Sequence, residues 1–177
     1  MLSVTGNNNV VDIKGSSFKH TEIRINGSNN TLIIEEGCII GEGCSFWLEG
    51  NDNLIRIGKN VTMTSHCHFN AQEHKTSIIV GDDCMFSNTI VVRTSDSHPI
   101  YNDLGERINM AKDIHIMNHV WIAPKSVIMK GAVVGDGCVI GQYSLVNKQI
   151  PKNCLAVGMP AKVVKENIRW TREDVLK

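Results

Sequence analysis

The chain has 177 residues, of which 42% are hydrophobic, and its 18 basic residues balance its 18 acidic residues. This length and composition favour a single domain with a hydrophobic core. The N-terminal residues lack the basic and apolar regions of a secretory signal, and no run of about 18 apolar residues occurs, so we expect a cytoplasmic protein without a membrane span.

Charge is unevenly distributed along the chain. Residues 1–110 contain 8 basic and 13 acidic side chains, whereas residues 111–177 contain 10 and 5. The basic C-terminal third has no dense run of Lys and Arg interleaved with aromatic residues, so we expect no nucleic-acid partner. It favours a local site for an anionic ligand, with solvated lysines on an ordinary surface as the alternative.

Short apolar strands separated by turns make up residues 1–56. Residues 6–9 (GNNN) and 27–30 (GSNN) are typical turn sequences. We therefore expect irregular coils that cap this end of the domain. Residues 50–53 and 70–75 are similarly rich in turn formers and predict loops.

A six-residue repeat runs through residues 57–162 and is clearest in their C-terminal half. Aliphatic residues recur every six positions, at Ile116, Ile122, Ile128, Val134, Ile140 and Val146. A small or β-branched residue stands four positions after the first five of them: Val120, Ser126, Ala132, Cys138 and Ser144. One large and one small inward position fit a strand-plus-turn unit, three of which close a triangular coil. The repeat predicts stacked coils that pair as parallel sheets.

The same register places most of the cysteines. Five of the six occupy the small inward position: Cys38, Cys44, Cys67, Cys84 and Cys138. We expect them to be buried, small and poorly reactive, which disfavours both a disulfide framework and a cysteine nucleophile.

The repeat breaks after Val92 and resumes near Met110, so residues 93–110 should protrude as a loop. Pro99 restricts His98 to an extended backbone. Because functional residues are often held on loops by a rigid scaffold, this insertion is the first candidate for a site.

Four motifs in order resemble those of the hexapeptide-repeat acyltransferases. They are His98-Pro99 in the loop, Val120-Trp121-Ile122-Ala123, Ile150-Pro151-Lys152-Asn153, and the segment AVGMPAK at residues 156–162. The similar groups are the galactoside and maltose acetyltransferases and the capsule, lipopolysaccharide and exopolysaccharide O-acetyltransferases, and the match covers roughly residues 57–170. The resemblance implies an all-β, left-handed parallel β-helix, a homotrimer with active sites between subunits, and transfer of an acetyl group from acetyl-CoA to a sugar or glycan hydroxyl.

By that resemblance His98 is the general base, which begins to remove the acceptor hydroxyl proton as the oxygen attacks the thioester. Trp121 is a second catalytic residue, near the histidine. Asp96 could fix the histidine tautomer or orient the acceptor, and a backbone carbonyl could do the former instead. Pro124 lacks the N–H that many relatives offer to the thioester oxygen, so Trp121 or another coil amide becomes the candidate oxyanion donor. Packing between subunits is the alternative role for Trp121.

The resemblance also assigns the donor and acceptor contacts. The expected coenzyme A contacts are Pro124, Gln142, Asn147, Lys148, Lys162 and Lys165. The acceptor candidates are Asp96, Tyr101, His68 and Asn70. In the galactoside and maltose enzymes an Asn-Phe-Asn stands where this chain has His68-Phe69-Asn70, so the resemblance does not fix the identity of the acceptor.

Two other functions are compatible with the sequence. His66 and His68 flank an inward cysteine and could hold a metal in a β-helical hydratase or hydrolase, although no third ligand is evident and we expect no metal. The β-helix could also be a scaffold without activity. Residues 163–177, with Ile168, Trp170 and Val175 at helical spacing and a Thr171–Asp174 start to the last turn, predict a short amphipathic C-terminal helix.

Overall fold

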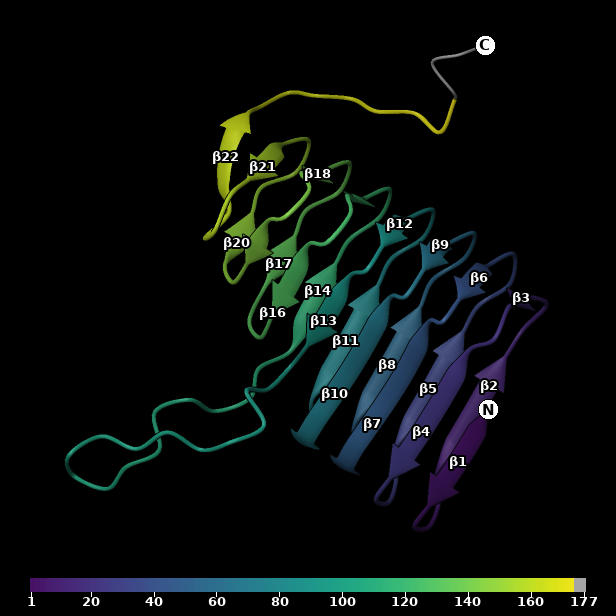
Figure 1. The fold of residues 1–177 in the computed structure, drawn as a ribbon, viewed down its shortest axis with the longest axis vertical. Helices are drawn as coiled ribbons and strands as arrows, with labels where there is room; N and C mark the ends of the chain where they lie inside the picture. Colours follow the sequence, from purple (N-terminus) through teal and green to yellow (C-terminus); the bar gives the residue numbers. More distant parts are fainter. Residues whose placement is uncertain (174–177) are drawn as a thin grey trace.

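The computed structural model describes residues 1–173, which form a stack of three-sided coils (Figure 1). Each coil contributes one strand to each of three sheets, so every third strand is a neighbour in its sheet. The first sheet contains β1 (Leu2–Thr5), β4 (Glu22–Asn26), β7 (Ser45–Asn51), β10 (His68–His74), β13 (Val91–Arg93), β16 (Val127–Met129) and β19 (Leu145–Val146). The second contains β2 (Val10–Ile13), β5 (Thr31–Ile34), β8 (Leu54–Ile57), β11 (Ser77–Val80), β14 (Ile114–Ile116), β17 (Val133–Val134) and β20 (Gln149–Ile150).

The third sheet has one further strand. It contains β3 (Ser17–Phe18), β6 (Ile39–Glu42), β9 (Thr62–Ser65), β12 (Met85–Asn88), β15 (Trp121–Ile122), β18 (Val139–Ile140), β21 (Leu155–Val157) and β22 (Lys162–Lys165). The ladders between coils are parallel, and β22 pairs with β21 in the antiparallel direction. The described residues therefore form an all-β parallel β-helix, as the repeat predicts.

The pairing register confirms the six-residue unit in the C-terminal coils. Ile128 pairs with Val146, which is 18 residues or three units further along the chain. The six predicted aliphatic positions, Ile116 to Val146, are each at most 1% exposed. The interior is thus a continuous column of these side chains, fixed by the repeat.

The N-terminal coils are longer than predicted, but they are complete. Phe46 pairs with Phe69, 23 residues further on, and the same sheets continue down to β1. Residues 50–51 and 70–74, expected in loops, extend strands β7 and β10 instead. The expected irregular coils over residues 1–56 are therefore regular coils with an enlarged corner.

A ladder of buried polar side chains stabilises that enlarged corner. Asn30, Asn53 and Thr76 occupy equivalent places in successive coils and are at most 5% exposed. The Asn53 N–H donates to Asn30 Oδ1, and the Thr76 N–H donates to Asn53 Oδ1, both at 3.0 Å. Each side chain therefore satisfies a backbone group of the next coil, which stabilises the stacking of the extra residues.

The core confirms the packing role predicted for the cysteines. All six, including Cys154, are buried and free. The rings of Phe46 and Phe69 stack at 5.3 Å in the same interior. Burial raises the pKa of the Cys84 thiol to about 12, so this group stays protonated at neutral pH.

The expected C-terminal helix is wrong for the part of the tail that the structure describes. Residues 162–165 form β22, which covers the open edge of β21, and residues 166–173 run back along the coil corners (Figure 1). Asp174 and Val175, which the helix prediction also used, lie outside the described residues. Contacts with the coils decide this conformation, because a helix this short is marginal on its own. None of residues 1–173 belongs to a helix that is long and apolar enough to cross a membrane.

Candidate active site

A long arm projects from the coil stack between β13 and β14 (Figure 1). It spans residues 94–113 and contains the predicted loop of residues 93–110 except Arg93, which ends β13. Its outer part is a small hairpin in which the Ile108 N–H donates to the Ile100 carbonyl at 2.9 Å and the Asn102 N–H donates to the Glu106 carbonyl at 3.0 Å. His98 lies at the beginning of the arm and is exposed. The structure therefore presents the predicted base on a folded, protruding element.

Ion pairs fasten the base of the arm to the coils. Glu73, on β10, accepts hydrogen bonds from Arg107 Nη1 at 2.8 Å, Arg107 Nη2 at 2.7 Å and Ser95 Oγ at 2.6 Å. The Arg107 guanidinium holds the pKa of the Glu73 carboxyl below its usual range. This bidentate pair joins the returning strand of the arm to the coil beneath it.

Asp96 makes a second fastening at the same place. Its carboxylate accepts hydrogen bonds from the Lys130 ammonium and from Asn109 Nδ2, the latter at 2.9 Å. The bond from Lys130 holds the pKa of Asp96 below its usual range. Within residues 1–173 no hydrogen bond joins this carboxylate to the His98 ring, so the geometry favours loop anchoring over tautomer control.

Trp121 lies in a groove of about 530 Å³ on the third sheet and its corner with the first. The groove is lined by Trp121, Ala123, Pro124, Val139, Gly141, Gln142, Leu155, Lys165, Ile168, Arg169 and Trp170. It brings together three predicted coenzyme A contacts, Pro124, Gln142 and Lys165. The Trp121 indole N–H donates to Ser87 Oγ at 3.2 Å, so an oxyanion role would require it to leave or share this bond.

The remaining predicted donor contacts lie elsewhere. Asn147 lines a cavity of about 360 Å³ that also contains Asp96, Lys112, Met129, Lys130 and Leu145, at the base of the arm. Lys148 and Lys162 are exposed and line neither this cavity nor the Trp121 groove. The arm that contains His98 leaves the corner between the first and second sheets, whereas the Trp121 groove lies at the corner between the third and first sheets. The two features are therefore at the opposite corners that flank the first sheet.

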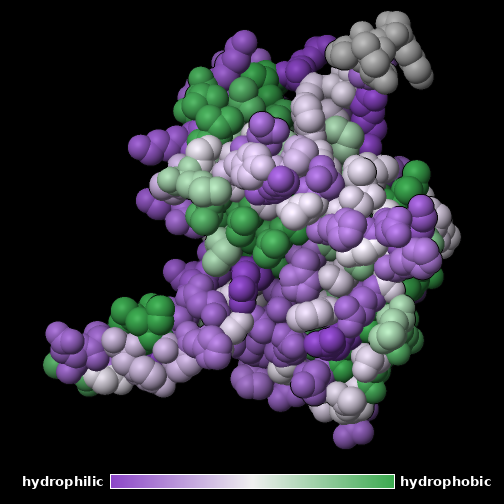
Figure 2. All heavy atoms as spheres, in the orientation of Figure 1, coloured by the Kyte–Doolittle hydropathy of each residue, from purple (hydrophilic) through white to green (hydrophobic). Residues whose placement is uncertain are grey.

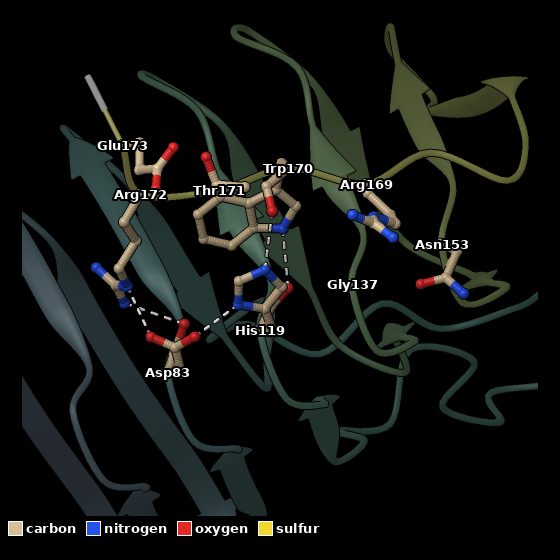
Figure 3. Close-up of a pocket in the computed structure, with 9 residues that line it drawn as sticks. All are labelled: Asp83, His119, Gly137, Asn153, Arg169, Trp170, Thr171, Arg172 and Glu173. Atoms are coloured by element: carbon tan, nitrogen blue, oxygen red, sulfur yellow. Dashed lines mark hydrogen bonds and ion pairs between the residues drawn. The ribbon is translucent and has the colours of Figure 1, made fainter. Parts of the chain in front are cut away.

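The C-terminal strap, defined here as residues 166–173, forms one wall of the Trp121 groove through Ile168, Arg169 and Trp170. Figure 3 shows the strap at a neighbouring cavity, where Trp170 lies beside His119 and Arg172 lies beside Asp83. The rings of Trp170 and His119 stack at 4.1 Å, and Trp170 Nε1 donates to the His119 carbonyl at 3.0 Å. His119 Nδ1 lies 2.6 Å from Asp83 Oδ2, and Arg172 Nε donates to Asp83 Oδ1 at 2.6 Å. The carboxylate of Asp83 therefore joins the strap to the corner beneath it.

Sequence reasoning missed the groove residues of the strap. Ile168, Arg169 and Trp170 line the groove, and Arg169 also lines a neighbouring cavity of about 540 Å³ on the other side of the strap. The spacing of Ile168 and Trp170 predicts one face of a helix, whereas the structure places both side chains in the groove wall. A basic residue beside two apolar ones in an already basic tail was the available signal.

The acceptor candidates lie in three different settings. His68 Nδ1 is 2.6 Å from Ser45 Oγ. The rings of His68 and Trp47 are nearly perpendicular, with their centroids 4.6 Å apart. Burial lowers the pKa of His68, which favours the neutral ring. Asn70, also on β10, is 5% exposed, whereas Tyr101 is 59% exposed on the arm.

His66, the other residue of the metal alternative, is exposed at a corner with a φ of 52°. Its ring covers Gly43, where a Cβ would lie 2.8 Å from His66 Cδ2. Across residues 1–173, no group of three or more His, Cys, Asp or Glu side chains is arranged to hold a metal ion.

Known proteins share this sequence and this fold. Residues 113–148 match the family described as bacterial transferase hexapeptide (six repeats). The chain is 33% identical, over 98% of its length, to a polysialic acid O-acetyltransferase from Neisseria meningitidis, of which it covers 90%. It is 37% identical, over 68% of its length, to the polysialic acid O-acetyltransferase of Escherichia coli O1:K1 / APEC, but spans only 39% of that longer protein.

Solved structures agree with these relatives. The polySia-specific acetyltransferase NeuO superposes with a TM-score of 0.79 at 33% identity, over 99% of this chain and 90% of that one. A galactoside acetyltransferase in complex with coenzyme A gives a TM-score of 0.53 at 27% identity, over 72% of this chain and 64% of that one. The chain therefore belongs to the hexapeptide-repeat acyltransferase family, and its coils form a left-handed parallel β-helix.

Proposed function

We propose that the protein is an O-acetyltransferase that moves an acetyl group from acetyl-CoA to a hydroxyl of a sugar or glycan. The observation that carries this proposal is a histidine on an anchored arm together with an apolar groove that ends in basic side chains. The first relatives are named for polysialic acid, so that polymer is the first acceptor to test. The buried free thiols fit the reducing cytoplasm that we propose as its location.

In the proposed reaction the acceptor oxygen attacks the thioester carbonyl directly. A neutral His98 imidazole takes the hydroxyl proton as the new C–O bond forms. The C–S bond then breaks, and coenzyme A leaves as the thiol or thiolate while the acetyl group stays on the acceptor oxygen. The buried cysteines support a mechanism without a cysteine-bound acyl intermediate.

The donor is proposed to lie in the Trp121 groove. Its apolar lining suits the pantetheine arm, and Lys165 and Arg169 supply positive charge for the phosphates. Asn147, Lys148 and Lys162 lie outside this groove. They are proposed to contact either the outer end of the same coenzyme A molecule or a coenzyme A molecule bound in the groove of a neighbouring subunit. Trp121 serves as a wall beside the reacting thioester, where its ring excludes water.

We also propose a homotrimer with each active site between two subunits. We define the His98 arm and the Trp121 groove as the two half-sites. Support for the trimer comes from their separation, because in one chain they occupy the two opposite corners that flank the first sheet. The arm also exposes Ile100, Leu104 and Ile108 by 53%, 82% and 61%, which suits contact with another copy. The apolar side chains on this projecting arm are visible in Figure 2.

The variant His98→Ala tests the base directly. With acetyl-CoA and polysialic acid or a panel of sugars, we expect acetyl transfer to fall about 100-fold or more, because general-base catalysis contributes that much. Thiol release and mass measurement of the acetylated acceptor would follow the reaction. His20→Ala is the control, since His20 is exposed far from the arm.

Two outcomes would contradict the proposal. Near-wild-type transfer by His98→Ala would remove the assigned base. An absence of transfer by the wild-type protein to every acceptor would instead favour the scaffold interpretation. Bound zinc in the purified wild-type protein that is lost in His66→Ala would support the metal alternative.

A further inference from the structure

The side chain of Asn109, at the end of the arm, makes four hydrogen bonds. Its Nδ2 donates to the His98 carbonyl at 2.8 Å and to Asp96 Oδ2 at 2.9 Å. Its Oδ1 accepts from the Ile100 N–H at 2.7 Å and from Arg107 Nε at 3.3 Å. Asn109 is 8% exposed, so the whole capacity of this buried carboxamide is used.

Two of these bonds enclose the backbone around His98. The carbonyl of His98 and the N–H of Ile100 stand on either side of Pro99, which has no N–H of its own. One carboxamide therefore binds this tripeptide as the backbone of a partner strand would. Because the His98 side chain is exposed, the place of its ring depends on how firmly this backbone is held.

The other contacts connect Asn109 to the coils. Lys130 Nζ donates to the main-chain carbonyl of Asn109 at 3.0 Å. It also binds the carboxylate of Asp96, which accepts a bond from the Asn109 side chain. Arg107, the second partner of Oδ1, forms the bidentate pair with Glu73 on β10. The backbone of His98 is thus linked to two coils through a single buried side chain.

We infer that Asn109 is a positioning residue for catalysis, whose carboxamide fixes the backbone of His98 so that the imidazole meets the acceptor hydroxyl. This inference rests on the proposed function, in which His98 is the base. Nothing in the sequence singled out Asn109, because its partners come together only in the folded arm.

The variant Asn109→Asp removes both donated bonds and keeps the size of the side chain and the oxygen that accepts from Ile100 and Arg107. We expect kcat for acetyl transfer to fall about 100-fold, the effect of a displacement near 1 Å at a reacting group. We expect the KM for acetyl-CoA to change less than about twofold, since none of the four side-chain partners of Asn109 lines the Trp121 groove.

Asn102→Asp is the matched control on the same arm. Asn102 Oδ1 accepts from the Leu104 and Glu106 N–H groups at 3.0 and 2.9 Å, contacts that an aspartate retains. Its Nδ2 donates to Glu106 Oε2 at 2.9 Å, so this variant also loses a bond to a carboxylate, but one that does not involve residues 96–98. We expect this variant to keep the wild-type kcat. Equal losses in the two variants would indicate a general need for a rigid arm and would overturn the specific role of Asn109.

Binding of acetyl-CoA and the melting temperature would be measured for each variant, so that unfolding is recognised. If Asn109→Asp does not fold, Asn109→Ser is used and the same split between kcat and KM decides. An unchanged kcat in a folded Asn109 variant, in a preparation where His98→Ala is inactive, overturns this inference alone. Activity that survives in His98→Ala would instead refute the proposed function on which it rests.

Discussion

At the scale of single residues, the arm depends on two carboxylates whose charged forms are stabilised by their partners. Arg107 lowers the pKa of Glu73, and Lys130 lowers that of Asp96. A carboxyl group whose pKa is lower in the folded than in the unfolded protein contributes stability above its unfolded pKa, and that contribution disappears as the pH falls through the folded value. The base of the arm should therefore loosen in acid.

The variant Glu73→Gln tests this at the residue scale. At neutral pH we expect it to lower the free energy of unfolding by about 1 kcal/mol, because an ion pair with two short hydrogen bonds is lost. As the pH falls below about 4, the difference from wild type should shrink, since the wild-type carboxyl is then protonated too. Melting temperatures from pH 3 to 7 would measure it, and a constant difference over that range would contradict the ion-pair explanation.

Glu36→Gln provides a matched comparison. Glu36 pairs with Lys59 at 2.8 Å, but its side chain is 64% exposed. Exposed pairs contribute little because water and salt screen them. We therefore expect this variant to melt close to wild type at every pH.

At the scale of elements, the C-terminal strap shows how contacts with other elements override local preference. Its residues are held by the corners of earlier coils: Ile168 by Asn153, Trp170 by His119, and Arg172 by Asp83. Arg172 also donates from Nη2 to the backbone carbonyls of Asp83 and Cys84, both at 3.0 Å. These contacts place Trp170 against the groove, where its ring centre lies 6.0 Å from that of Trp121.

Arg172→Ala should release this wall without touching the groove directly. We expect the KM for acetyl-CoA to rise several-fold while kcat with saturating donor changes little, because only the placement of Trp170 is affected. Steady-state kinetics with varied acetyl-CoA would show it. Arg56→Ala is the control, since the half-exposed Arg56 pairs with Glu35 at 3.1 Å on the second sheet, away from the strap. An unaltered KM would mean that the strap does not shape the donor site.

At the scale of the whole molecule, the proposed His98 and Trp121 half-sites lie at the two opposite corners that flank the first sheet of one chain. The cavity containing Asp96 and the groove containing Trp121 share no lining residue. In a trimer whose threefold axis is parallel to the axis of the β-helix, the His98 corner of one subunit would lie against the Trp121 corner of the neighbouring subunit. The proposed active site then needs His98 from one subunit and Trp121 from its neighbour.

A mixed assembly tests this arrangement. His98→Ala and Trp121→Ala should each be weakly active alone, but co-expression in equal amounts should restore about one quarter of the sites, namely those with both native residues at one interface. Activity per chain after purification of the mixed trimers would measure the recovery. If both residues served the same site within one chain, no mixture would exceed the activity of the separate variants.

Part of the proposed site could be predicted from the sequence because those residues are recognisable by their position in the six-residue repeat. His98 stands where the register stops, and Pro124 and Gln142 stand at equivalent places in successive coils, so both fall in one groove. Asn109 and Trp170 carry no such signal. Their partners, Asp96 and His98 for one and His119 for the other, are 13, 11 and 51 residues away in sequence.

The sequence by itself determined the coiled architecture, because a repeat of six with alternating large and small inward residues can be buried only if every coil repeats its neighbour. It also located the arm, since a break in that repeat must leave the stack. Only the tertiary structure decided that the N-terminal coils are complete and that residues 166–173 form a strap rather than a helix. In both cases the deciding bonds join residues of different coils, and local propensity contains no information about them.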